Sequence, residues 1–393
     1  MGVVEKNVCV SVCVSLTALK LFGFWAPAGL TGTQRALYNC YGFLSFMFIL
    51  GTYLIIQVVD MFLIWGDVAL MTGTAFVLFT NLAHTAKIAA VVARQDTLRH
   101  LVDDADELLA AETGPGKEIV DSCNRETWQQ QLLYCCLTTV TVAGWATSAE
   151  KNQLPLRAWY PYDTSVSPAY ELTYLHQVGA LFVAAYLNVG KDTLVASLIA
   201  QARCRLRLAA LNLASLTDGL TPNAQGTLSA EQEAAAWSRL AAASRRHQAA
   251  LAAAAVLQAC FSAPVFAQFG VSMIIICVTA FQLTAVRHTG NLVRLASMGT
   301  YLLNMMFQVF IYCYQGNQLS EESMEIATAA YSCGWTACSA RLRRGLLLVM
   351  VRTRRAARLS AGGFATLSLA SFMAIVKTSY SLFTVLQQAD EQK

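Results

Sequence analysis

The feature that most constrains this chain is a series of long apolar runs that contain almost no Asp, Glu, Lys or Arg. A helix of roughly 20 apolar residues crosses a bilayer core of about 30 Å, so runs of this length predict membrane-spanning helices. Only 13% of the 393 residues are charged, which is about half the usual share of a water-soluble protein. We therefore expect an all-α polytopic membrane protein with seven transmembrane helices. The seven runs are 38–59, 68–86, 127–149, 172–190, 249–286, 295–320 and 359–389.

The distribution of lysine and arginine predicts the orientation of these helices. Positively charged loops are retained on the cytosolic side of a membrane. Most lysines and arginines outside the runs lie before the first run and in every second loop after it. This pattern predicts a cytosolic N-terminus and an extracellular C-terminus, which is the inverse of a G-protein-coupled receptor. The twelve cysteines fall in the runs or in the cytosolic segments, so no extracellular disulfide is expected.

The segments on the cytosolic side are too long to be simple connections. Residues 94–109 alternate charged and apolar side chains with helical spacing. Ser229 and Gln232 form a capping box that predicts the start of a further helix. We expect such cytosolic helix extensions to form a bundle that packs subunits together.

A cytosolic anchor helix is predicted to open at Ser320 and to cover 320–355. Tyr331 and Trp335 are four residues apart and share one face of it, so they are the predicted subunit-packing residues. The alternative is a helix that lies on the inner membrane surface, where its arginines meet anionic headgroups. The predicted organisation is a cytosolic N-terminal segment (1–37), six transmembrane helices with their extensions (38–350) and a last transmembrane helix (359–389).

Four patches of the sequence resemble the insect odorant receptors, which are seven-helix ligand-gated ion channels. They lie near the start (21–25), in the loop before the fourth run (154–177), after the sixth run (316–335) and through the last run (359–386). One departure concerns the segment before the last helix, where the family usually reads Arg-Ser-Gln-Lys-Pro and this chain reads Arg-Thr-Arg-Arg-Ala at 352–356. Without the proline, we expect Gly362 and Gly363 to break the helix there.

The resemblance implies an odour-specific subunit of a non-selective cation channel in the plasma membrane of a sensory neuron dendrite. In the family, four subunits surround a pore lined by the last helix, and the odour-specific subunit assembles with a common co-receptor into a heterotetramer. The implied partners are therefore the co-receptor, a small volatile ligand, the lipid bilayer and permeant cations, with no cofactor, metal or nucleic acid. Two alternatives are a gustatory-receptor-like channel and, from another class, a secondary transporter.

The resemblance also implies that residues 359–389 line the pore and that the bundle at 38–314 binds the ligand, in a pocket in the outer half of the second, third, fourth and sixth runs. Odorants are small and apolar, so the pocket should be lined mainly by apolar and aromatic side chains with few polar groups. Depth along each helix, at 1.5 Å per residue, selects the candidates. They are Phe76, Phe79, Thr80, Thr141, Trp145, Val178, Leu181, Phe182, Met298, Tyr301 and Met305.

A pore helix must hold water when open and exclude it when closed, so both hydroxyl and apolar side chains are expected along its lining. We predict a stripe that includes Val376, with Ser379 wetting the conduit and Phe383 forming an outer hydrophobic constriction; Leu382 is the second candidate for the constriction. The alternative is that the hydroxyl groups bond to carbonyls four residues earlier and that the aromatic rings only pack.

The sequence gives little support to an enzyme. Its five histidines are scattered without the spacing of a metal site, and no phosphate-binding glycine loop is present. A net charge of +4 is too small for a nucleic-acid-binding surface. A secondary transporter usually has an inverted internal repeat, and none is recognisable here.

Overall fold

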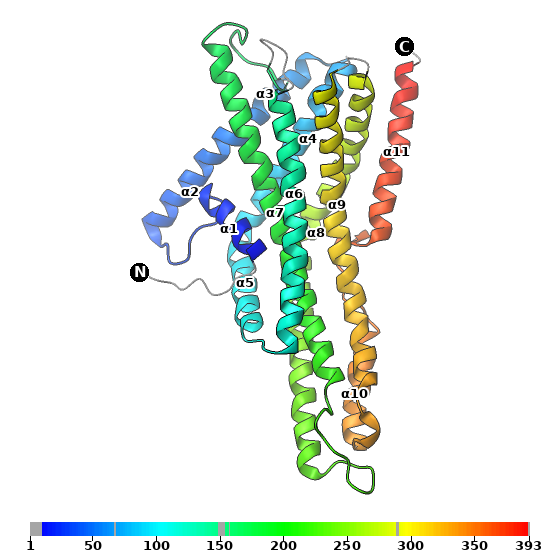
Figure 1. The fold of residues 1–393 in the computed structure, drawn as a ribbon. Helices are drawn as coiled ribbons and strands as arrows, with labels where there is room; N and C mark the ends of the chain where they lie inside the picture. The colour runs from blue at the N-terminus through cyan, green and yellow to red at the C-terminus, as the bar shows by residue number, and fades with distance from the viewer. Residues whose placement is uncertain (1–9, 67, 148–153, 157, 288–290, 392–393) are drawn as a thin grey trace.

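The computed structural model describes residues 10–66, 68–147, 154–156, 158–287 and 291–391, and most of this part of the chain is helical. Long helices run side by side along one axis, with α11 at one edge of the molecule and α1 and α2 at the opposite edge (Figure 1). The helices are α1 (Val10–Leu21), α2 (Gly32–Phe46), the π-helical turn η1 (Met47–Gly51), α3 (Thr52–Leu63), α4 (Val68–Ala93), α5 (Gln95–Ala110), α6 (Pro115–Thr147), α7 (Ala169–Ala214), α8 (Ala230–Arg287), α9 (Leu292–Ser332), the 3-10 turn η2 (Trp335–Ala337), α10 (Ala340–Thr353) and α11 (Leu369–Glu391); the strands are β1 (Ser360–Ala361) and β2 (Ala365–Thr366).

Six helical stretches in the described part of the chain are long and apolar enough to cross a membrane. They coincide with all the predicted runs except 127–149, which forms the second half of α6. That helix has a more polar character because buried residues such as Thr127, Gln131 and Thr138 point from it into the bundle. It nevertheless lies lengthwise between α7 and α9 (Figure 1). The predicted all-α membrane-spanning fold is therefore confirmed.

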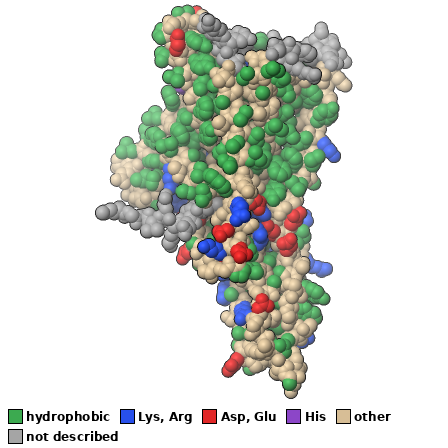
Figure 2. Space-filling view, viewed as in Figure 1, with side chains coloured by type: hydrophobic (Ala, Val, Ile, Leu, Met, Phe, Trp, Pro, Cys, Tyr) green, Lys and Arg blue, Asp and Glu red, His purple; other side chains and the backbone are tan. Residues whose placement is uncertain are grey.

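Apolar and charged side chains separate along the long axis. Figure 2 shows apolar side chains covering the upper part of the visible face, whereas most acidic and basic side chains gather on the lower part. The lower part consists of α5, α10 and the ends of α6, α7, α8 and α9 (Figure 1). At its upper edge Arg203 on α7 is buried between Glu126 on α6, at 2.8 Å, and Glu322 on α9, at 2.9 Å. This ion cluster ties three helices together where the apolar surface ends.

Contacts with the backbone at the end of α1 attach this helix to α2. After α1, the chain turns through Gly23, whose φ of 82° is in the left-handed region that favours glycine. A Cβ at Gly23 would lie 2.5 Å from the Cα of Gly42 on α2, so only a glycine allows this close approach. Tyr38 on α2 donates a hydrogen bond to the carbonyl of Lys20 at 2.7 Å, and Tyr41 donates one to Leu21 at 2.6 Å. The first sequence patch, 21–25, is therefore the turn that docks α1 on α2.

The capping box at the start of α8 is confirmed. Ser229 N donates to Gln232 Oε1 at 3.1 Å, and Gln232 N donates to Ser229 Oγ at 3.3 Å. The prediction of one anchor helix over 320–355 is wrong. Helix α9 continues without a break from the sixth run to Ser332, and α10 begins only after Ser339, whose hydroxyl accepts from Leu342 N. Between them the chain turns at Gly334, whose N–H donates to Thr217 Oγ1 at 3.0 Å.

The last helix starts later than predicted. Residues 360–366 form a two-stranded antiparallel hairpin, and α11 begins at Leu369 rather than at residue 359. The expectation that the two glycines break the helix is wrong, because α10 already ends at Thr353. Gly362 and Gly363 instead form the hairpin turn, with φ of 60° and 77°. A Cβ at Gly362 would lie 2.8 Å from the ring of Phe266 on α8, so the hairpin is also closely packed.

Gly316 on α9 offers a test of the packing that positions α11. A Cβ at this residue would lie 2.4 Å from the Cβ of Leu367 and 2.7 Å from its carbonyl oxygen, so Gly316→Ala must displace the segment that leads into α11. We expect a loss of about 1–3 kcal/mol of stability, as for other overpacked interiors, measured as a lower melting temperature in detergent. Gly299→Ala is the matched control in the same helix, because nothing lies within 4 Å of its Cβ. Equal melting temperatures for the two variants would contradict this packing.

Candidate functional site

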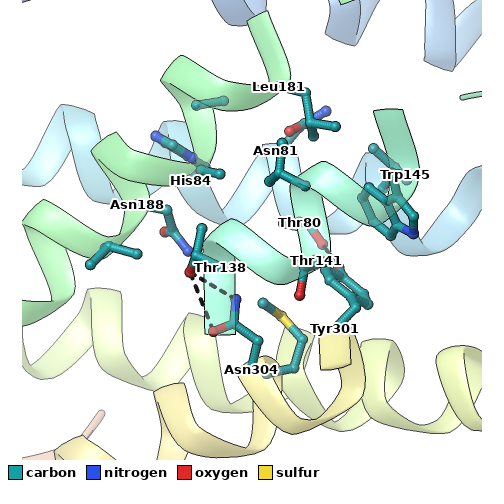
Figure 3. A pocket seen from close by; sticks show the side chains of 16 residues that line it. Thr80, Asn81, His84, Thr138, Thr141, Trp145, Leu181, Asn188, Tyr301 and Asn304 are labelled. Carbon is teal, nitrogen blue, oxygen red and sulfur yellow. Dashed lines mark hydrogen bonds between the residues drawn. The ribbon is translucent and has the colours of Figure 1, made fainter. Parts of the chain in front are cut away.

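A small enclosed cavity lies among α4, α6, α7 and α9. Its volume is about 60 Å³, and it is bounded by side chains from all four helices (Figure 3). The fold brings these helices together because each turns a face of small and polar residues toward the others. The cavity is lined by Val77, Thr80, Asn81, His84, Thr138, Thr141, Val142, Trp145, Leu181, Ala184, Ala185, Asn188, Val189, Tyr301, Asn304 and Met305.

One end of the cavity is aromatic. The rings of Trp145 and Tyr301 are 5.0 Å apart between centroids and are tilted by 41°. The hydroxyl groups of Tyr301 and Thr80 are 2.6 Å apart and share a hydrogen bond. Both rings belong to a buried apolar cluster with Val77 and Met305, which fixes the shape of this end. A ligand here would meet mainly carbon atoms.

The other end of the cavity is polar. Asn304 and Thr138 are joined by long hydrogen bonds, with 3.3 Å between Asn304 Nδ2 and Thr138 Oγ1 and 3.4 Å between Thr138 Oγ1 and Asn304 Oδ1. Asn188 accepts a hydrogen bond from Lys87 Nζ at 2.9 Å through its side-chain oxygen. His84 lies beside Asn188 on the same side of the cavity (Figure 3). The cavity is therefore apolar at one end and polar at the other.

A buried carboxylate lies directly behind the polar end. Asp192 is fully buried and accepts a hydrogen bond from Lys87 Nζ at 2.7 Å. It also accepts from the hydroxyl groups of Tyr134, at 3.0 Å, and Tyr312, at 2.8 Å. The side-chain amide of Gln308 donates to the same carboxylate. These donors come from α4, α6 and α9, so one side chain on α7 binds three other helices.

These partners stabilise the buried negative charge of Asp192. A buried charge is tolerated when an opposite charge and further hydrogen bonds replace the lost water. Lys191 is a second buried cation at this level, and its Nζ lies 3.4 Å from the carbonyl oxygen of His84. Lys87 and Lys191 thus share one neighbouring carboxylate, Asp192, so the region behind the cavity is rich in positive charge.

The cavity contains about half of the predicted ligand-binding residues. Those that line it are Thr80, Thr141, Trp145, Leu181, Tyr301 and Met305. Phe79, Val178, Phe182 and Met298 do not line this cavity, and a role for them in ligand binding stays a prediction. Phe79 packs into the apolar cluster behind Trp145, and the ring of Phe182 stacks on Tyr186. The side chain of Phe76 lies outside the described residues.

The sequence analysis missed the polar end of the cavity. Asn81 and Asn304 lie directly beside selected residues, whereas His84, Thr138 and Asn188 lie about one to two turns deeper. None of the five has the apolar or aromatic side chain that was expected for the pocket. A signal for them was present: polar side chains recur three or four residues apart inside the apolar runs, as in Thr80–His84 and Tyr301–Asn304. Such repeats place polar groups on one buried face.

The predicted conduit residues differ in their burial. The side chain of Ser379 is fully buried within the chain, and its hydroxyl donates to the carbonyl of Ile375 at 2.8 Å, so its predicted role in wetting a conduit stays a prediction. Val376 and Phe383 are half-buried, and Leu382 is 44% exposed. These three residues remain predictions.

The predicted subunit-packing residues lie at the lower end of the molecule. The ring centroids of Tyr331 and Trp335 are 6.0 Å apart, although Trp335 belongs to η2 and not to the same helix as predicted. Tyr331 is 63% exposed. A role in subunit packing remains a prediction.

The buried carboxylate generates a stability prediction. Asp192→Asn removes the negative charge and leaves Lys87 and Lys191 without a counter-ion, which should cost about 3–5 kcal/mol and lower the melting temperature in detergent strongly. The double variant with Lys87→Met should lose less, because one unpaired cation is also removed. Asp96→Asn is the matched control, since Asp96 forms an exposed pair with Arg35 at 3.4 Å and such pairs contribute about 0–1 kcal/mol. An Asp192→Asn variant as stable as the Asp96→Asn variant would refute this assignment.

The sequence matches known proteins over most of its length. A family model described as 7tm Odorant receptor matches residues 67–380. The chain is 25% identical to Odorant receptor 46a, isoform A, of Drosophila melanogaster over 326 residues, which cover 80% of this chain and 81% of that protein. It is 23% identical to Odorant receptor Or1 of Anopheles gambiae over 97% of this chain and 96% of that protein.

A solved structure has the same fold. The insect olfactory receptor OR5 from Machilis hrabei in complex with eugenol superposes with a TM-score of 0.79 and covers 98% of this chain and 99% of that one, at 14% sequence identity. A second structure of the same receptor gives a TM-score of 0.75 at 16% identity. Low identity with such complete coverage indicates a shared arrangement of helices.

Proposed function

Because the chain belongs to the seven-transmembrane odorant receptor family, we propose that it is the odour-specific subunit of a ligand-gated cation channel in the plasma membrane. The subunit assembles with the common co-receptor into a heterotetramer, with its N-terminus in the cytosol and its C-terminus outside. The observation that carries the proposal is the enclosed cavity among α4, α6, α7 and α9. A small volatile molecule binds there and favours the open state of the channel, because it binds that state more tightly.

The surface of α11 supports an assembly around a pore. Only 11% of its most apolar stretch is buried within the chain, compared with 56% for α7 and α8. An apolar helix with so little intramolecular contact needs lipid or neighbouring subunits to cover it. In the proposed assembly, α11 lines the conduit, and Val376, Leu382 and Phe383 form its narrow outer part. Tyr331 and Trp335 pack against a neighbouring subunit at the cytosolic end.

The cavity sets an upper limit on affinity. A single water needs about 10–15 Å³, so 60 Å³ accepts about four to six water-sized groups without rearrangement. A ligand of about ten heavy atoms would need side chains to move, and at about −0.5 kcal/mol per atom it would gain only about −5 kcal/mol. A binding free energy of this size corresponds to a dissociation constant of about 0.2 mM.

The direct test of the proposed function is an electrophysiological recording. Cells that express this chain together with the co-receptor should give odour-evoked cation currents that differ in odour preference from those of the co-receptor alone. A channel gives a fast current that does not saturate with the concentration of the permeant cation, whereas a secondary transporter gives a slow flux that saturates with its transported substrate. Surface-expressed complexes that respond to no volatile in a broad panel would overturn the proposed function.

The position of the binding site has its own test. Tyr301→Ala removes one of the two rings of the aromatic end, so we expect the rank order of activating volatiles to change, with at least about a tenfold shift in half-maximal concentration for some. Tyr186→Ala is the matched control, because that ring is exposed and outside the cavity. Dose–response curves across an odour panel measure both. Identical rank orders in wild type and Tyr301→Ala would place the ligand elsewhere.

A further inference from the structure

The polar end of the cavity contains an imidazole nitrogen that lacks a hydrogen-bonding partner. His84 is 2% exposed, and its Nε2 has no partner within the described part of the chain. Of the buried side-chain atoms in this condition, it is the one whose residue lines the cavity among α4, α6, α7 and α9. An unpaired buried polar atom costs free energy, so a molecule that supplies the missing hydrogen bond gains affinity.

The polar side chains near His84 either accept a hydrogen bond from another residue or form only long hydrogen bonds with each other. The side-chain oxygen of Asn188 accepts from Lys87. Asn304 and Thr138 are joined at 3.3–3.4 Å, which is long for a hydrogen bond. Figure 3 shows these groups on the same side of the cavity as His84, with Trp145 and Tyr301 on the other. A ligand that fits this distribution has one polar group at the His84 end and hydrocarbon at the aromatic end.

The chemistry of imidazole selects the polar group. In a neutral histidine, Nε2 either donates or accepts a hydrogen bond, depending on the tautomer. A hydroxyl group satisfies either tautomer, because it both donates and accepts, whereas a carbonyl satisfies only the protonated nitrogen. We infer that, within the proposed receptor function, this cavity is selective for small neutral alcohols whose hydroxyl group binds His84 Nε2.

The charges behind the cavity exclude protonated amines. The ammonium group of Lys191 lies 3.4 Å from the carbonyl oxygen of His84, and that of Lys87 lies 2.9 Å from the side-chain oxygen of Asn188. The carboxylate of Asp192 is already shared by these two cations and its other donors. An alkylammonium ligand at the His84 end would add a third positive charge without a counter-ion, so it should bind worse than the corresponding alcohol.

The test uses three probes of equal heavy-atom count and similar shape, chosen for the small cavity: butan-1-ol, pentane and butylamine. They are applied to cells that express the chain with the co-receptor, beside a broad odour panel. Butan-1-ol should activate wild type at about a tenfold lower concentration than pentane, because one buried hydrogen bond changes binding by about that factor. Butylamine should be weaker than butan-1-ol.

Two variants then assign the preference to His84. His84→Phe keeps a ring of similar size but removes Nε2, so the half-maximal concentrations for butan-1-ol and pentane should become equal within about twofold. His84→Gln restores a polar atom near the same position and should recover part of the alcohol preference. His176→Phe is the matched control, because His176 contacts Phe48 and lies outside the cavity; it should keep the wild-type preference.

The outcomes are decisive in both directions. The inference is overturned if wild type responds to pentane or butylamine at least as sensitively as to butan-1-ol, a result that needs no variant to fold. It is also overturned if His84→Phe reaches the surface and keeps the wild-type ratio. Currents evoked by other volatiles in the panel would then leave the proposed receptor function standing, whereas the absence of any evoked current would overturn both.

Discussion

The carboxylate of Asp192 is the interaction on which the arrangement of the central helices depends. It is fully buried, and its two oxygens accept from side chains on α4, α6 and α9. Such a group stabilises only the one arrangement in which all its donors are in place, because removing a single donor leaves charge or polar atoms buried and unpaired. The helices therefore meet at a fixed level, and the cavity lies next to that level.

The position of the cavity next to this cluster gives ligand binding a physical route to the rest of the chain. Asn188 lines the cavity and also binds Lys87, which in turn pairs with Asp192. A molecule at the polar end thus changes the surroundings of a group that contacts the cluster directly. On the same helix as the cluster donor Tyr312, Phe310 packs edge-to-face on Phe372 of α11, with ring centroids 5.6 Å apart. Packed side chains therefore connect α9, which carries part of the cavity wall, to the last helix.

Much of the fold could be predicted from the sequence, because the signals were local. Charge-free runs predicted the spanning helices, and the capping box at Ser229 and Gln232 predicted the start of α8, since each depends on residues close in the chain. The prediction of a helix from Ser320 to residue 355 failed, because the chain reverses at Gly334, where a contact with Thr217, distant in sequence, determines the turn.

The candidate site was less predictable than the fold. Depth along each helix found the aromatic end, because rise per residue is constant. It did not find His84 or Asn188, because their place at the cavity depends on contacts between helices, such as the hydrogen bond from Lys87 on α4 to Asn188 on α7. The burial of Ser379 within the chain could not be predicted for a related reason: the sequence gives the spacing of a stripe on α11, but only the packing of α11 on its neighbours determines which stripe is buried.

The most direct test of the account is a structure of the chain assembled with its co-receptor and bound to an activating volatile. We expect ligand density among α4, α6, α7 and α9, between Tyr301 and His84, with the Asp192 cluster intact behind it. Another cavity, of about 330 Å³, lies between α8 and α10 beside His247 and Arg352. Density there, with the cavity beside Tyr301 empty, would contradict the account.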